Sequence, residues 1–205
     1  MSTIGLDNLV YALITGGADG KEEYGTPVSL AKAIKADISV ENAEAILYAD
    51  DGAAEDVKMF KGGKVSIGVD DIGTAKAKEL TGAEIDKNGV LVSSDTDIAP
   101  YVALGFRALK PNGKYRYFWL YKVKFAVPSI NLATKGDSIS FQTPTIEGSI
   151  MRRNKPDAKN KHPWKAEVTE GDTGINESVL TNWFKNVYEP SFETASGETS
   201  GESES

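Results

Sequence analysis

The segment from Tyr48 to Ile72 constrains the fold more than any other part of the chain. Its pattern predicts three strands, an acidic loop between the first two, and a glycine turn before the third. In the third strand, Val65, Ile67 and Val69 alternate with small or polar residues, which is the period of a half-buried strand. In chain order the predicted elements are residues 45–48, 50–56, 57–60, Gly62–Gly63 and 64–70.

These strands would form a long antiparallel arm around a loop that is too small and polar to bury anything. A two-stranded arm is only marginally stable in water, and it needs a larger sheet or a partner. The segment therefore predicts a subunit that reaches its neighbours rather than a ligand pocket. The residues predicted to form this inter-subunit arm are Tyr48, Asp50, Asp51 and Asp56.

The composition bounds the domain organisation and the class of protein. The chain has 205 residues, of which 40% are hydrophobic, so it suits one domain with an extension. Residues 1–190 are predicted to form the domain, and residues 191–205, rich in Ser, Thr, Gly and Glu, a disordered acidic tail. Cysteine is absent from the sequence, which excludes disulfides and thiolate metal sites.

Targeting and charge narrow the function further. The first residues lack the basic and apolar regions of a secretory signal, and no apolar run approaches the ~20 residues of a membrane helix. We therefore expect synthesis in the cytoplasm and no membrane association. The net charge of -7 argues against a protein that grips nucleic acid, although an acidic surface would let nucleic acid pass without binding.

The remaining pattern predicts a mainly β fold: an antiparallel sandwich or open barrel with a flanking helix and the long hairpin arm. Two helices are expected, one over residues 72–80 with Asp70 or Asp71 as N-cap and Gly82 beyond its end, and a last one capped by Asn176. Further strands are expected over residues 9–15, 34–40, 90–92, 101–109, 115–127, 138–151 and 164–168, with a Pro-Asn-Gly turn at residues 110–114.

Candidate chemistry is sparse, and we expect no catalytic, cofactor or metal site. The single histidine, His162, precedes a proline in a lysine-rich loop without a nucleophile motif nearby. Gly16–Lys21 fails the spacing of a phosphate-binding loop. The Asp50, Asp70 and Asp95 clusters lack the ligand pattern of a calcium loop. A weak cation site, and a carboxylate pair that meets only in space, stay open.

Two other features have a functional and a structural interpretation. Tyr115, Tyr117, Trp119 and Tyr121 share one strand face, either as a stacking platform for sugars or bases or, as we favour, as a buried ladder in a core or subunit interface. The basic loop after residue 151 is either solvated or pairs with acidic loops of a neighbour. Its possible interface residues are Arg152, Arg153 and Lys155.

Five segments together resemble the major tail tube protein family of long-tailed, non-contractile bacteriophages. In order they are Leu6–Thr15, Tyr24–Val28, Tyr48–Gly52, Gly63–Ile72 and Asn182–Pro190. None is specific by itself, and their order and spacing carry the resemblance. Some family members have an additional C-terminal immunoglobulin-like domain. This sequence has the acidic tail in that place, so we expect such an outer domain either to be absent or to be made by a longer product.

The resemblance implies a structural virion protein that self-assembles into stacked hexameric rings, with sheets closing across subunits around a lumen. DNA would pass through this tail tube into the host, and an acidic lumen would keep it from binding. The implied partners are other copies of the chain, the tape measure, tail terminator and distal tail proteins, and DNA as passing cargo, with no cofactor. A tube of the contractile type stays open. The alternatives are a monomeric carbohydrate- or protein-binding β-sandwich module and an enzyme with dispersed carboxylates.

Overall fold

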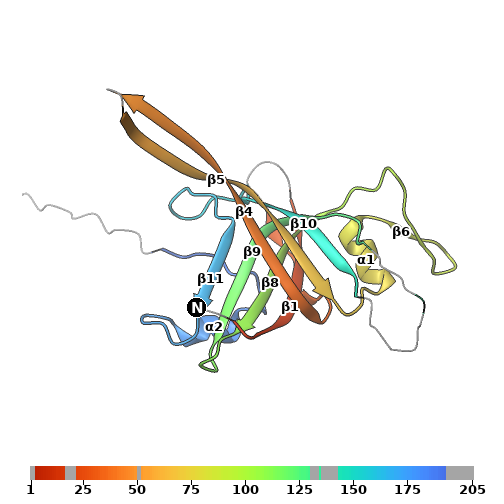
Figure 1. Cartoon of the computed structure of the whole chain (residues 1–205). Coiled ribbons are helices and arrows are strands. Elements are labelled where there is room, and N and C mark those ends of the chain that lie inside the picture. Colours follow the sequence, from red (N-terminus) through yellow and green to blue (C-terminus); the bar gives the residue numbers. More distant parts are fainter. Residues whose placement is uncertain (1–2, 17–21, 50–51, 130–133, 135–142, 193–205) are drawn as a thin grey trace, which may run out of the picture.

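The computed structural model describes residues 3–16, 22–49, 52–129, 134 and 143–192, with the backbone alone for residues 45–57. Figure 1 shows a curved sheet with two short helices at its margins and one long hairpin projecting from it. The strands are β1 (Gly5–Thr15), β2 (Glu23–Tyr24), β3 (Val28–Ser29), β4 (Ala33–Ala49), β5 (Gly52–Val69), β6 (Glu84–Ile85), β7 (Leu91–Val92), β8 (Tyr101–Leu109), β9 (Tyr115–Phe125), β10 (Thr145–Met151) and β11 (Lys165–Thr169), and the helices are α1 (Thr74–Thr81) and α2 (Glu177–Asn182).

One antiparallel sheet contains most of these strands. Its order is β2-β1-β8-β9-β10-β5-β4, with β3 paired to β1 and β11 paired to β9, while β6 and β7 pair separately. This architecture confirms the predicted mainly β antiparallel fold with two helices. In Figure 1 the β4–β5 hairpin crosses the β1, β8 and β9 part of the sheet.

The sheet has apolar clusters on both faces of β1, β8 and β9. The inner cluster joins these strands to β5, β10 and α1, through residues such as Leu104 and Ile67. The outer cluster joins them to the C-terminal segment, through residues such as Trp119 and Trp183. The predicted burial of β1 on both faces is therefore confirmed: Leu9 and Tyr11 belong to the inner cluster, and Ala12 to the outer.

A β-bulge in β9 changes which residues face the inner cluster. Val102 pairs with Val123 and Leu104 with Leu120, so two steps along β8 match three steps along β9. Because side chains alternate along a strand, the extra residue reverses the alternation. Leu120 faces the inner cluster from one side of the bulge and Val123 from the other. The bulge lies where β9 changes partner from β11 to β10.

The helices begin and end largely as predicted, with one correction. Gly82 follows α1 in the left-handed conformation and donates its N–H to the Lys78 carbonyl, as expected of a helix C-terminus. The N-cap of α1 is Gly73, so the prediction of Asp70 or Asp71 was wrong. The Asp70 carboxylate instead accepts from the backbone N–H groups of Asp71 and Lys32. Asn176 caps α2 as predicted, accepting from the Ser178 N–H.

The arm was predicted correctly as a hairpin and wrongly in its segments. Residues 52–56, expected in an acidic loop, belong to β5, which continues through Gly62 and Gly63 without a turn. Pairing with β4, from Ala49 opposite Gly52 to Ala33 opposite Val69, replaces both features. The register shifts at three places, between Ala33 and Lys35, between Glu41 and Asn42, and between Leu47 and Tyr48. Of the strand predicted over residues 138–151, the described part is β10, and residues 138–142 lie outside the described residues.

Candidate assembly surface

Strand β4 is a long free edge of the sheet. Among the described strands it pairs only with β5, so its other row of backbone N–H and C=O groups has no strand beside it. Ile34, Ile38 and Val40 are exposed along this strand, by 56%, 36% and 43%. An edge that is long and apolar is a template for pairing with another chain. This edge is therefore the first element of the candidate assembly surface.

The second element is the arm, which we define as residues 41–62. Strand β5 has β10 on its other side only from Gly63 onward, where Gly63 pairs with Ile150. Beyond that row the hairpin has two strands, and Figure 1 shows it extending away from the body. Its exposed residues include Met59, whose side chain is 66% exposed. A two-stranded ribbon of this length gains stability from a further surface to pack against.

Two of the four predicted arm residues are described, and both lie toward the far end of this hairpin. Tyr48 is in β4, opposite Ala53, and Asp56 is in β5, opposite Ile46. Asp50 and Asp51 lie outside the described residues. The contact of these four residues with a neighbouring subunit stays a prediction.

The β4, β5, β10 and β9 strands also present an open face, opposite the inner cluster. It is formed by Lys35, Asp37, Ser39, Lys64, Ser66, Lys124, Glu147 and Ser149, which lie in register across the strands. Asp37 and Glu147 flank Ser66 in one row, and Lys64 and Lys124 flank Ser149 in the next. The Lys35 ammonium lies 2.6 Å from the Asp37 carboxylate, on the side of the Asp37–Ser66–Glu147 row that is away from Lys64 and Lys124. The open face is thus polar, made of small and charged residues, and close to neutral.

The aromatic face of β9 is buried, as the favoured interpretation predicted. Trp119 and Tyr121 are fully buried and Tyr117 nearly so, beneath the C-terminal segment. The Trp119 indole donates to the Trp183 carbonyl at 3.0 Å, and the Tyr121 hydroxyl donates to the Tyr188 carbonyl at 2.8 Å. These rings stabilise the fold and do not present a platform for sugars or bases.

The basic loop is held within the chain at two of its three predicted interface residues. Arg153 is only 1% exposed, and its guanidinium donates to Glu189 at 2.7 Å and lies over the Tyr121 ring. Lys155 donates to the same carboxylate at 2.9 Å. Arg152 is exposed. The expectation of a simply solvated loop is therefore wrong for Arg153, and an interface role for this loop stays a prediction.

The loop also meets a buried carboxylate that the sequence did not single out. Glu22 is 2% exposed and accepts from the Lys122 ammonium and from the backbone N–H groups of Asn154 and Lys155. Together with Glu189, it ties the N-terminal, central and C-terminal parts of the chain to one point. Only the intact fold brings these residues together, so no local motif could have identified Glu22.

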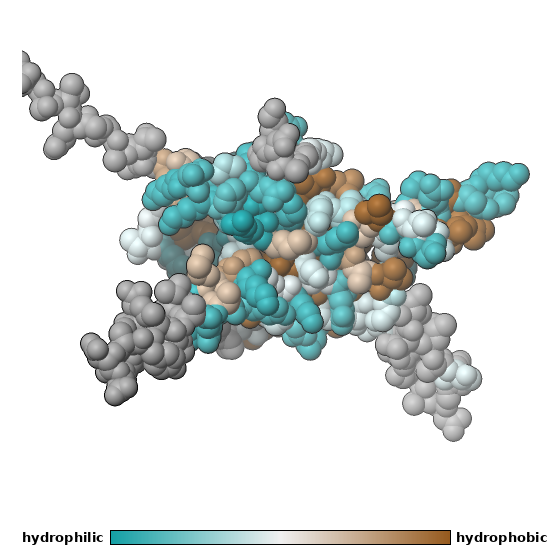
Figure 2. All heavy atoms as spheres, turned by 90° about the horizontal axis from the view of Figure 1, so that it is seen from above, coloured by the Kyte–Doolittle hydropathy of each residue, from teal (hydrophilic) through white to brown (hydrophobic). Residues whose placement is uncertain are grey.

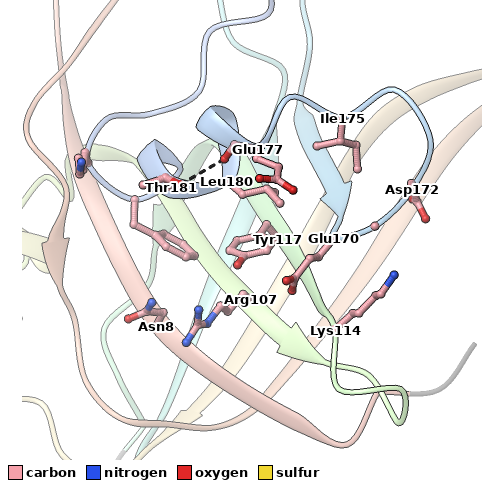
Figure 3. A pocket seen from close by; sticks show the side chains of 13 residues that line it. Asn8, Arg107, Lys114, Tyr117, Glu170, Asp172, Ile175, Glu177, Leu180 and Thr181 are labelled. Carbon is pink, nitrogen blue, oxygen red and sulfur yellow. Dashed lines mark hydrogen bonds between the residues drawn. The ribbon is translucent and has the colours of Figure 1, made fainter.

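Figure 3 shows a cavity between α2, the loop after β11 and the ends of β1, β8 and β9. Its volume is about 900 Å³. Two of its charged groups make contacts that join neighbouring elements. Arg107 donates to both Asp7 oxygens, at 2.6 and 3.0 Å, and this carboxylate raises the pKa of Arg107. Glu170 accepts from the backbone N–H of Tyr115. These contacts join β1 to β8, and β9 to the loop after β11.

Three aspartates outside this cavity form hydrogen bonds with the backbone. Asp70, Asp86 and Asp157 each accept from backbone N–H groups of neighbouring turns, and these bonds lower the pKa of each carboxyl. Among the described residues, no group of three or more His, Asp or Glu side chains is placed to hold a metal ion. His162 is exposed. Within the same residues no helix is long and apolar enough to cross a membrane.

Comparisons with known proteins give distant structural similarity only. The chain matches no family model and no curated protein. One similar solved chain is from the baseplate of the anti-feeding prophage (AFP), with a TM-score of 0.39 and 6% identity over 82% of this chain and 97% of that chain. Another is from the tube-terminating cap of the same particle, with a TM-score of 0.39 and 11% identity over 78% and 87%. Similarity at this level does not establish the fold or the function of the chain.

Proposed function

We propose that this chain is a self-assembling structural subunit of a phage-like tail tube. The observation that carries the proposal is the long β4 edge, with its apolar side chains exposed and its far half extended into the arm. Copies that add a strand to this edge would cover the unpaired backbone and bury Ile38 and Val40. A head-to-tail contact of this kind closes into a ring when its rotation allows, and the resemblance described above implies hexameric rings that stack.

The open face is the surface that we assign to the lumen. The opposite face of the same strands is occupied by the inner cluster, and the outer face of β8 and β9 is covered by the C-terminal segment. The open face carries no aromatic side chain among its residues, and its charges nearly balance. DNA would find there neither a continuous basic surface to bind nor apolar residues to stack on. Low adhesion, rather than the repulsion expected of an acidic lumen, would then let DNA pass.

The two rival functions have less support. A sugar-binding module would need the β9 aromatic face in solvent, and Trp119 and Tyr121 are fully buried. We propose that the chain is not an enzyme, since the carboxylates with shifted pKa values support backbone turns and ion pairs. Tape measure, terminator and distal tail proteins are proposed as further partners because the ends of a tube need other contacts than its middle.

Electron microscopy of the purified chain tests the proposal, and the expected result is rings or hollow tubes. A matched variant replaces residues 44–58 with Asn-Gly, which suits a two-residue hairpin between the paired residues Ala43 and Met59. This variant should melt within a few degrees of the parent and form no tubes. Particles that stay monomeric at high concentration in the parent, or normal tubes in the variant, would overturn the proposal.

A further inference from the structure

The arm meets the body through an aromatic stack at its root. The rings of Phe60, on β5, and Trp164, before β11, have centroids 4.6 Å apart and planes within 1°. Both side chains also pack against the inner cluster. Phe60 is thus the arm residue that joins the two-stranded ribbon to the core.

The Trp164 side of the stack is firmly attached to the sheet. Its carbonyl accepts from the Tyr121 N–H at 3.0 Å, and the preceding Pro163 carbonyl accepts from the Arg153 N–H at 3.2 Å. Arg153 is itself buried and paired with Glu189. A residue held in this way is a fixed surface against which the arm can rest.

The Phe60 side lies beside a point where the ribbon can bend. Asn42 pairs with Phe60 and Glu41 with Gly62, so Lys61 is the extra residue of a bulge. Bulges bend a strand and increase its twist. Gly63 follows directly, and a Cβ there would lie 2.6 Å from the Ser39 carbonyl oxygen, so this close approach of backbones requires glycine. The bulge and the adjacent glycines allow the arm to bend at this point. Its direction relative to the body must therefore be fixed by another contact.

We propose that Phe60 and Trp164 are positioning residues that hold the arm at one angle to the body before a second copy binds. The stack prevents the arm from bending at the bulge, so the arm already has the orientation in which a second copy binds. Orientation fixed in advance reduces the conformational entropy lost on association. The inference deepens the proposed function and rests on it for its purpose, although the angle itself is a property of the single chain.

Because the sequence contains no cysteine, two introduced cysteines can carry spin labels at defined places. Glu44→Cys on the arm and Asn186→Cys on the body are both at exposed positions. Electron–electron double resonance at a dilution that prevents tubes should give a narrow distance distribution. Trp164→Ala should at least double its width, and Trp164→Phe, which keeps a stacking ring, should keep it narrow. Loss of tubes should accompany the broadening.

Met59→Ala is the matched control, since Met59 neighbours Phe60 on the arm and is 66% exposed. It should leave the width unchanged. Phe60→Ala removes the other ring of the stack, on the arm. It serves as the test if Trp164→Ala does not fold. An unchanged width in both alanine variants would overturn the inference. A different result is a parent protein that forms no tubes and still shows a narrow distribution that broadens when the stack is removed. That result would support the role of the stack and count against the proposed function.

Discussion

The Lys122 ammonium lies 2.5 Å from the Glu22 carboxylate, although the residues are 100 positions apart in the chain. Their side chains are 9% and 2% exposed. The bulge in β9 falls between Leu120 and Val123, so the extra residue helps to place Lys122 beside this acid rather than in the inner cluster. The bulge in β9 therefore supports the ion pair that joins the N-terminal part of the chain to a central strand.

Removing the cation alone should be costly. Lys122→Met leaves a buried carboxylate without its counter-charge, and a loss of about 3–5 kcal/mol in the free energy of unfolding is expected. Urea unfolding followed by tryptophan fluorescence measures it. Lys35→Met, which breaks the exposed pair with Asp37, should cost at most about 1 kcal/mol. Equal losses in the two variants would contradict the assigned role of Glu22.

The protein should lose stability in alkali. Burial raises the pKa of Tyr11, Tyr24 and Tyr121, with the Glu79 carboxylate adding to the effect at Tyr11. In the unfolded chain these phenols ionise near pH 10. Above that pH the folded state binds more protons than the unfolded state, so stability is complete below it and falls as pH rises. Melting temperatures between pH 8 and 11.5 should decline only at the upper end, and the phenolate absorbance of these residues should appear together with unfolding.

Gly105 should tolerate no side chain. A Cβ at this position would lie 2.8 Å from the Trp119 ring, which is fully buried and has little room to move. Gly105→Ala is expected to cost about 1–3 kcal/mol and to shift the tryptophan emission. Gly68→Ala is the control, because its nearest contact would be an ordinary 3.7 Å. A neutral Gly105→Ala would mean that the C-terminal segment moves aside easily.

The sequence predicts some parts of this fold more clearly than others. The Pro-Asn-Gly turn, Gly82 and Asn176 act through their own backbone, so they marked the β8–β9 turn and the helix ends correctly. The alternation of Val65, Ile67 and Val69 likewise predicted a strand with one buried face.

The failures share a cause, which is contact with residues far along the chain. The small and acidic residues 52–56 have the composition of a loop, and hydrogen bonding to β4 overrides it. Arg153 looked solvated because its partner Glu189 is 36 positions away. The β9 bulge has no signal of its own, since the register of β8 against β9 creates it. The arm was predicted because hairpin strands are neighbours in sequence.

A charge on the free edge should block assembly and spare the fold. Ile38→Lys adds a cation at a position that is 36% exposed on β4, and edge lysines oppose strand addition. Tubes should disappear from electron micrographs while the melting temperature changes by a few degrees at most. Ile38→Val, which keeps the apolar character, should assemble normally. Tubes of normal length from Ile38→Lys would place the interface elsewhere.

From the sequence positions of the paired strands we expect a definite order of strand pairing during folding. The β4–β5 ladder joins strands that are neighbours in the sequence, whereas Val10 of β1 can pair with Gly105 of β8 only after β8 has been synthesised. Local hairpins form in microseconds, and pairings between distant segments are slower. In a nascent chain we therefore expect the β4–β5 hairpin, with its unpaired edge, to form before the strands β8 and β9 of the body have been made. Slow expression should therefore favour correctly folded subunits, and rapid overexpression should favour aggregates in which hairpins of different chains have paired.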